Sequence, residues 1–162
     1  MNAAPALRLP LDLYSTDQLS AVILELRDYI GSLRDTAARK RARQGDEVTH
    51  TSALLLGVLH GANARAGDAA SAEAVLQELE AIRDKAVIAH VMLAALPNRT
   101  FKRQMTVWFR AEIDPYIFLT FAMRTDIGGG AVVQVGSQVY DFSFRQVLLG
   151  NRSRIAEIFS GV

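Results

Sequence analysis

Apolar residues recur at helical spacing through the first half of the chain. Ser15 and Gln18 form a capping box, which predicts a helix that begins there and runs to about Arg43. Its apolar positions alternate between steps of four and three residues, which is the spacing of a heptad seam. The seam consists of Leu19, Ile23, Leu26, Ile30, Leu33 and Ala37. It predicts either the core-facing side of a small bundle or a surface for a partner helix.

Two further helices are predicted in the first half of the chain. Residues 52–64 are apolar almost all round, which is typical of a buried helix. Residues 71–85 are rich in Ala, Glu and Leu and should turn one apolar stripe inward. That stripe consists of Val75, Leu76, Leu79 and Ile82. Residues 7–13, which contain Pro10, fit an extended arm ahead of the first helix.

After residue 85 the pattern changes to short apolar runs. Residues 86–95 are rich in β-branched residues and too short to span a bilayer, so they predict a buried strand. A helix capped by Asn98 or Thr100 follows and runs to about Ile113. Its predicted apolar face comprises Phe101, Met105, Trp108 and Phe109.

A second strand and a hairpin come next. Asp114 ends the helix, because Pro115 disfavours helical geometry in the residue before it. Residues 116–123 are a second apolar run that predicts a strand. Gly136 and Ser137 suit a two-residue hairpin turn. That turn pairs Val135 with Gln138, Val133 with Tyr140, and Ala131 with Phe142.

Two short motifs flank the predicted hairpin. Gly128, Gly129 and Gly130 allow positive φ angles or a close backbone approach before its first strand. They do not form a phosphate loop, because such a loop follows a strand and opens a helix. Beyond the hairpin, Ser143 is a good N-cap for a final helix, and Asp141 places a negative charge near the N-terminus of that helix.

This stretch resembles the C-terminal part of the delta subunit of bacterial ATP synthase, which corresponds to the mitochondrial oligomycin sensitivity conferring protein. That family typically carries an Ile-Gly-Gly step, a β-hairpin, and Asp-Gly-Ser-x-Arg entering the last helix. The matching positions are Ile127, Gly128, Gly129, Asp141, Ser143 and Arg145. Gly130 extends the glycine step, Phe142 replaces the usual Gly, and Phe144 replaces a smaller aliphatic residue.

The elements together predict an α+β fold. A helical region of about three helices, in residues 1–85, precedes a small mixed sheet with covering helices in residues 86–162. The sheet region should follow the order β-α-β-β-β-α. The resemblance covers about residues 86–160 and implies the same kind of sheet, covered by two helices. The family's N-terminal part is a six-helix bundle, so the helices here are either a reduced bundle or an unrelated module.

The resemblance implies a noncatalytic peripheral-stalk subunit of a rotary proton-translocating ATP synthase. Such a subunit links the catalytic head to the stalk, so that the head cannot rotate. Its implied partners are the N-terminal segments of the alpha subunits and the C-terminal helix of the stalk b subunit. It carries no cofactor and no catalytic residues. It lies peripherally, at the cytoplasmic side of the bacterial inner membrane, and meets the membrane only through its partners.

Two groups of residues are candidates for partner contacts. The first group is the heptad seam, represented by Leu19, Ile23, Leu26 and Ile30. The second group consists of aromatic residues, which often anchor interfaces: Trp108, Phe109, Phe142 and Phe144. Each aromatic is also a candidate for the core. The alternative function is a helical adaptor or oligomerisation protein, unrelated to ATP synthase, that binds partners through the seam from Leu19 to Ala37.

Composition and scattered histidines limit the chemistry. A net charge of +1 gives no global preference for nucleic acid. The absence of cysteine excludes a disulfide framework and thiolate metal sites. His50, His60 and His90 lie on separate predicted segments, so they predict no metal or catalytic cluster. A small enzyme with an unrecognised site in the sheet region is a third class, and it predicts a pocket that holds perturbed ionisable groups.

Overall fold

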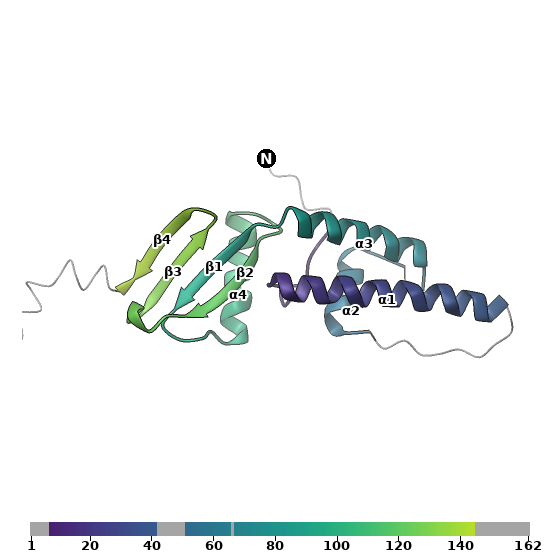
Figure 1. Ribbon diagram of the computed structural model, residues 1–162, viewed down its shortest axis with the longest axis horizontal. Coiled ribbons are helices and arrows are strands. Elements are labelled where there is room, and N and C mark those ends of the chain that lie inside the picture. Colours follow the sequence, from purple (N-terminus) through teal and green to yellow (C-terminus); the bar gives the residue numbers. More distant parts are fainter. Residues whose placement is uncertain (1–6, 42–50, 66, 145–162) are drawn as a thin grey trace, which may run out of the picture.

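Helices occupy one end of the molecule and a mixed sheet the other (Figure 1). The computed structural model describes residues 7–41, 51–65 and 67–144. Within these ranges the chain forms four α-helices and one four-stranded sheet, so the α+β fold predicted from the sequence is confirmed. The final helix predicted after Ser143 lies outside the described residues.

The helical region contains α1 (Thr16–Arg41), α2 (Ala53–Gly61) and α3 (Ala69–Asp84). Helices α1 and α3 lie side by side and antiparallel (Figure 1). Two ion pairs join their exposed flanks, one between Arg27 and Glu80 and the other between Arg34 and Glu73. The two paired residues lie about two turns apart on each helix, and their order along the chain is reversed between α1 and α3. This reversed order is what an antiparallel pairing requires.

Local capping explains where these helices begin. The backbone N–H of Ser15 donates to Oε1 of Gln18 at 3.1 Å, and the N–H of Gln18 donates to Oγ of Ser15 at 3.3 Å. The predicted capping box of α1 is therefore confirmed. Helix α3 begins before the predicted Ser71, because the carboxylate of Asp68 accepts bonds from the first-turn backbone N–H groups.

The sheet combines one parallel and two antiparallel pairings. Its elements in chain order are β1 (Ile88–Leu93), α4 (Arg99–Glu112), β2 (Phe118–Met123), the short 3₁₀ helix η1 (Thr125–Ile127), β3 (Gly130–Val135) and β4 (Gln138–Ser143). The strand order is β2-β1-β3-β4. Strands β1 and β2 are parallel, with α4 as their crossover, and the β3–β4 hairpin adds antiparallel to the other edge of β1. Strands β2 and β4 are therefore the outer strands.

The hairpin has the register that the turn residues predict. The observed pairs are Ala131 with Phe142, Val133 with Tyr140, and Val135 with Gln138. Gly136 has a φ angle of +58°, as the first central residue of such a turn requires. This local prediction is confirmed in full.

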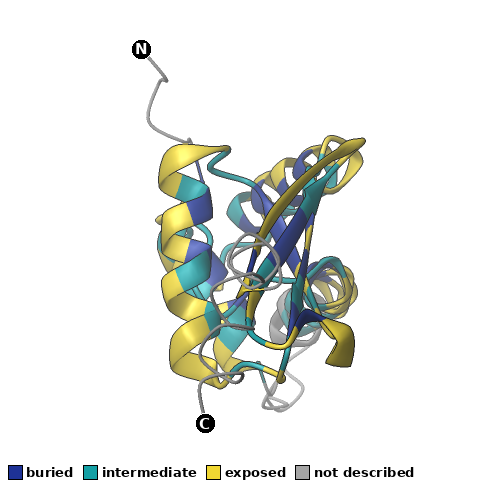
Figure 2. Ribbon diagram, turned by 90° about the vertical axis from the view of Figure 1, so that its left-hand side faces the viewer, coloured by how far each residue is buried: buried dark blue, intermediate teal, exposed yellow. Residues whose placement is uncertain are grey.

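Two apolar clusters form the interior. One fills the space between α1, α2 and α3 and also includes Leu7, Leu13 and, from the sheet, Phe118. The other lies between α4 and the sheet, around Phe109 and Val91. Figure 2 shows buried residues along the inner strands of the sheet, whereas β4 is almost entirely exposed. The two clusters meet where residues 7–14 pass between the helical region and the sheet.

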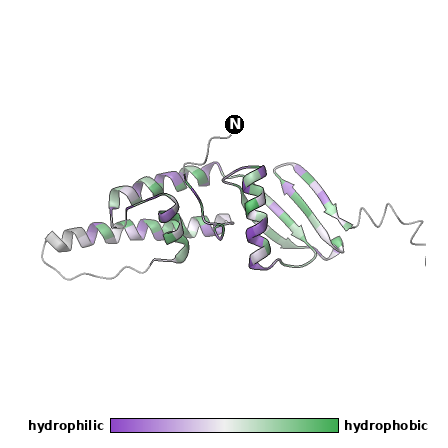
Figure 3. Ribbon diagram, turned by 180° about the vertical axis from the view of Figure 1, so that it is seen from behind, coloured by the Kyte–Doolittle hydropathy of each residue, from purple (hydrophilic) through white to green (hydrophobic). Residues whose placement is uncertain are grey.

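Helix α4 is rotated relative to the prediction. Phe109 is 1% exposed, but Trp108 is 53% and Phe101 39% exposed, so the predicted apolar face is wrong for these two residues. Thr106 is fully buried beside Phe109 instead. The physical reason is that Arg110 turns toward residues 9–13 and bonds their carbonyl oxygens. Seen from behind, α4 crosses the strands nearest the helical region (Figure 3).

Candidate partner-binding surfaces

Residues 7–15, called the arm below, are held by the guanidinium of Arg110. Its Nη1 donates to the carbonyl oxygens of Leu9 and Pro10, each at 3.1 Å, and its Nη2 donates to that of Leu13. Burial lowers the pKa of Arg110 to about 10, so the side chain stays charged near neutral pH. A cation thus binds three backbone carbonyl groups of the arm, and that of Pro10 also accepts a hydrogen bond from the N–H of Leu13.

The arm also forms a backbone hydrogen bond with β2. The backbone N–H of Leu119 donates to the carbonyl oxygen of Tyr14 at 2.6 Å. The Tyr14 ring meets the Phe121 ring edge-on, with their centroids 5.9 Å apart. The buried side chains of Leu7 and Leu13 anchor the arm in the helical cluster. The arm therefore connects the helical region to the sheet independently of the α3–β1 connection.

A glycine at the end of α2 allows the arm to pass close to this helix. A Cβ atom at Gly61 would lie 2.1 Å from the carbonyl oxygen of Arg8, which is far inside van der Waals contact. Backbone atoms cannot move away as a flexible side chain can. Glycine at this position therefore permits the close approach of the arm to α2.

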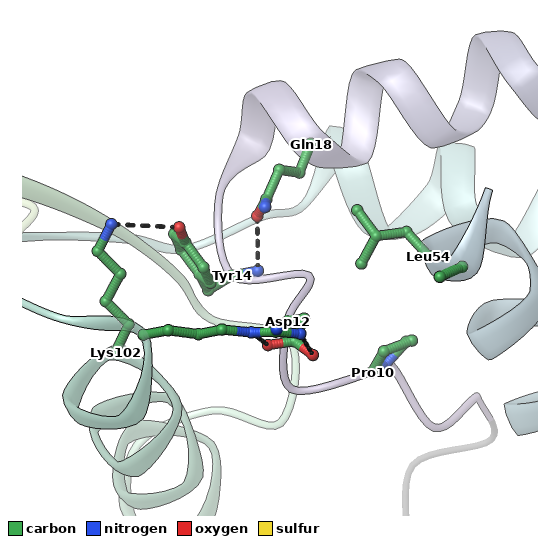
Figure 4. A pocket seen from close by; sticks show the side chains of 8 residues that line it. Pro10, Asp12, Tyr14, Gln18, Leu54 and Lys102 are labelled. Carbon is green, nitrogen blue, oxygen red and sulfur yellow. Dashed lines mark hydrogen bonds and ion pairs between the residues drawn. The ribbon is translucent and has the colours of Figure 1, made fainter.

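A pocket of about 450 Å³ lies where the arm meets α1, α2 and α4 (Figure 4). We call it the junction pocket. Its lining residues are Pro10, Asp12, Tyr14, Gln18, Ala53, Leu54, Arg99 and Lys102. Nε and Nη2 of Arg99 donate to the two carboxylate oxygens of Asp12 at 3.1 and 2.8 Å. The hydrogen bond from Arg99 is the main reason that the pKa of Asp12 lies below its ordinary value.

A second, more apolar groove of about 420 Å³ lies between α4 and the hairpin. We call it the hairpin groove. Its lining residues are Trp108, Phe109, Glu112, Ile113, Val133, Val135, Gln138, Tyr140 and Phe142. The rings of Tyr140 and Phe142 are stacked, with centroids 6.4 Å apart and an angle of 7° between their planes. On the other side of the groove, the ring of Trp108 stands edge-on to that of Phe109.

The first four residues of the heptad seam are part of the core, whereas Leu33 is half-buried. Leu19, Ile23, Leu26 and Ile30 are at most 5% exposed and belong to the helical cluster. Their candidacy for partner binding is therefore corrected: α2, α3 and the arm already cover them. The side chain of Ala37 lies outside the described residues.

The aromatic candidates divide into one core residue and three surface residues. Phe109 is buried under the sheet, so its candidacy as a partner contact is also corrected. Trp108, Phe142 and Phe144 are 53%, 65% and 59% exposed. Of these three, Trp108 and Phe142 line the hairpin groove, the first from α4 and the second from β4.

The glycine step forms the entrance to the hairpin. Ile127 is buried, and Gly128, Gly129 and Gly130 all have positive φ angles, of +68°, +155° and +80°. A Cβ atom at Gly130 would lie 2.3 Å from the carbonyl oxygen of Phe142 on the paired strand. The positive φ angle and the close approach together account for glycine at this position.

Asp141 and Ser143 lie in β4 itself. Oδ1 of Asp141 accepts a hydrogen bond from the backbone N–H of Ser143 at 2.8 Å, and Ser143 is buried at the end of the strand. This bond fixes the backbone locally, just before the end of the described chain. The helix that Ser143 is predicted to cap lies outside the described residues, and so does Arg145.

The histidines remain separate in space as in sequence. His60 lies in α2 and His90 in β1, while His50 is outside the described residues. Across the described part of the chain, no group of three or more His, Asp or Glu residues is placed to hold a metal ion. None of the described helices is long and apolar enough to cross a membrane.

The sequence did not predict the contact between Arg110 and the arm, and it did not predict the junction pocket. Its one available signal was Arg110, a cation that interrupts the inward side of α4 after Phe109. An arginine there needs buried acceptors, but the sequence does not say which segment supplies them. The comparisons with known proteins do not add to this: no family model and no curated protein matches the chain.

Proposed function

We propose that this chain is a noncatalytic peripheral-stalk subunit of a rotary proton-translocating ATP synthase, of the delta type. The observation that carries the proposal is the entrance to the hairpin. Buried Ile127 precedes three glycines with positive φ, and the hairpin that follows ends in Asp141 and Ser143. They include the positions on which the resemblance to the delta family rests, apart from Arg145, which lies outside the described residues. Their backbone geometry gives each a structural reason.

The hairpin groove supports a role in binding a helix. Trp108 and Ile113 line it from α4, and Tyr140 and Phe142 line it from β4, all of them at least 44% exposed. An amphipathic helix binds by laying its apolar face into such a groove, and large aromatics often anchor the contact. Under the proposal, the occupant is the C-terminal helix of the stalk b subunit. The helical region would then hold the N-terminal segments of the alpha subunits.

The arm supports a mechanical role. A subunit that resists rotation must transmit force from one partner-binding region to the other. The arm provides a second connection between the two regions, through Arg110, the edge of β2 and the buried Leu13. Force applied to the sheet would therefore reach the helices by more than the short α3–β1 connection.

Recovery from native membranes tests the proposal. We expect the tagged chain to recover ATP synthase head and stalk subunits together. Recovery of an unrelated set of proteins would contradict it. A cheaper check is the gene neighbourhood, which should contain other ATP synthase genes.

Variants of the hairpin groove test which surface carries the stalk contact. Trp108→Ser with Phe142→Ser should reduce recovery of the stalk subunit at least about tenfold, because anchor residues supply much of an interface's affinity. Phe101→Ser is the matched control, since Phe101 is an exposed aromatic on α4 that does not line the groove. Equal losses in both variants would place the contact elsewhere.

A further inference from the structure

The junction pocket is lined by hydrogen-bond donors. The Nζ atom of Lys102 donates to the hydroxyl of Tyr14 at 3.3 Å, which leaves the hydroxyl's own hydrogen able to donate. Oε1 of Gln18 accepts from the backbone N–H groups of Tyr14 and Ser15, both at 3.1 Å, so Nε2 is the remaining polar atom of that amide. Three different donor groups thus line one pocket (Figure 4).

The acceptors in the pocket are already in use. Arg99 bonds both carboxylate oxygens of Asp12, and Arg103 approaches Oδ2 of the same carboxylate at 3.6 Å. Lys102 is half-buried, and the described residues include no carboxylate paired with it. With Arg99 and Lys102 positive and Asp12 negative, the lining carries a net charge of +1.

Helix geometry adds to this positive character. Gln18 lies in the first turn of α1, Ala53 and Leu54 begin α2, and Arg99 and Lys102 lie in the first turn of α4. The N-terminal turn of a helix carries partial positive charge and backbone N–H groups without intrahelical acceptors. Asp17 lies in the first turn of α1 and the carboxylate of Glu25 bonds Ser52 at the start of α2, whereas the first turn of α4 contains no acidic residue. The start of α4 therefore adds most to the charge of Lys102.

The geometry points to the junction pocket as a binding site for a phosphate group. A ligand that complements donors and offers several acceptors is an oxyanion, and phosphate presents several acceptor oxygens at high charge. A pocket of about 450 Å³ also has room for more than the free ion. The source is therefore either inorganic phosphate or the phosphate of a small ester such as a nucleotide. This site is independent of the proposed stalk function.

Calorimetric titration of the full-length chain with inorganic phosphate tests the proposal, at constant ionic strength and near neutral pH. Two variants remove donors while preserving shape. Lys102→Met keeps the aliphatic stem, and Gln18→Glu keeps the oxygen that caps Tyr14 and Ser15 but replaces the Nε2 donor with a second oxygen. We expect each to weaken phosphate binding at least about tenfold. Lys85→Met is the control, because it removes the same charge from the C-cap of α3, which does not line this pocket.

Three results overturn the site: no heat beyond that given by chloride at equal ionic strength, binding that Lys102→Met and Gln18→Glu leave unchanged, or an equal loss in Lys85→Met. Circular dichroism of each variant must match the parent chain. A parallel titration with ADP distinguishes the sources. Tighter binding of ADP, with the same dependence on Lys102 and Gln18, identifies a phosphate ester, and weaker binding identifies the free ion.

Discussion

Arg110 shows how one side chain can connect parts of the chain that are far apart in sequence. It lies in the last turn of α4 and bonds carbonyl oxygens about a hundred residues earlier. Since its pKa of about 10 keeps it charged at neutral pH, these are charge-assisted bonds in a mostly buried setting. Removing the guanidinium would take the donor from the carbonyl oxygens of Leu9 and Leu13, while that of Pro10 would keep its bond from the N–H of Leu13.

We therefore expect Arg110→Met to lower the free energy of unfolding by about 3 kcal/mol, the usual cost of losing charged hydrogen bonds in a buried site. Urea denaturation measures the change. Arg103→Met is the control on the same helix, and we expect it to cost about 0.5 kcal/mol or less because its ion pair is exposed. Equal effects would show that Arg110 does not hold the arm.

Asp12 gives a prediction about pH. Its pKa is lowered below 3.8, chiefly by the hydrogen bond from Arg99, so the pair stabilises the folded state when the carboxylate is charged. That contribution is present above the unfolded pKa and is lost as the pH falls through the lower folded value. The difference in unfolding free energy between the parent chain and Asp12→Asn should stay constant above about pH 5 and narrow below 3.8. Acid titration of both by circular dichroism measures it, and a constant difference down to the acid limit would refute it.

At the scale of elements, the hairpin depends on its glycine entrance. Gly130→Ala should destabilise the chain by about 3 kcal/mol, because the new Cβ would meet a backbone oxygen and the φ angle would be strained. Gly128→Ala should cost only about 1 kcal/mol, since its φ angle is also positive but no atom lies within 4 Å of the new Cβ. Urea denaturation compares the two, and a similar cost for both would mean that close approach plays no part.

The elements that sequence reasoning located are those with local causes. The capping box of α1 and the hairpin register each depend on residues a few positions apart, and both are confirmed. The rotation of α4 and the burial of the heptad seam depend on segments distant in sequence. The alternating spacing predicts that Leu19 and Ile23 lie on the same face of α1, but it does not predict whether that face packs against α3 or against a partner protein. The junction pocket was missed for the same reason, because four separate segments contribute its lining.

At the scale of the whole molecule, the two apolar clusters should unfold together. Trp108, the single tryptophan, reports on the sheet region through fluorescence, while far-ultraviolet circular dichroism reports mostly on the helices. We expect the two signals to give one coincident transition in the parent chain, because the arm and Phe118 connect the clusters. In the double variant Arg110→Met with Leu13→Ala, the transitions should separate. Separate transitions in the parent chain would contradict this coupling.

The arm also sets the order in which the chain can finish folding during synthesis. Leu9 is made 101 residues before Arg110, which binds its carbonyl group. Phe118, which completes the helical cluster, is made later still. The nascent helices therefore emerge from the ribosome with an unfinished core, and contacts so distant in sequence form slowly. The arm is translated long before the residues that bind it, and it is among the last segments to reach its native position.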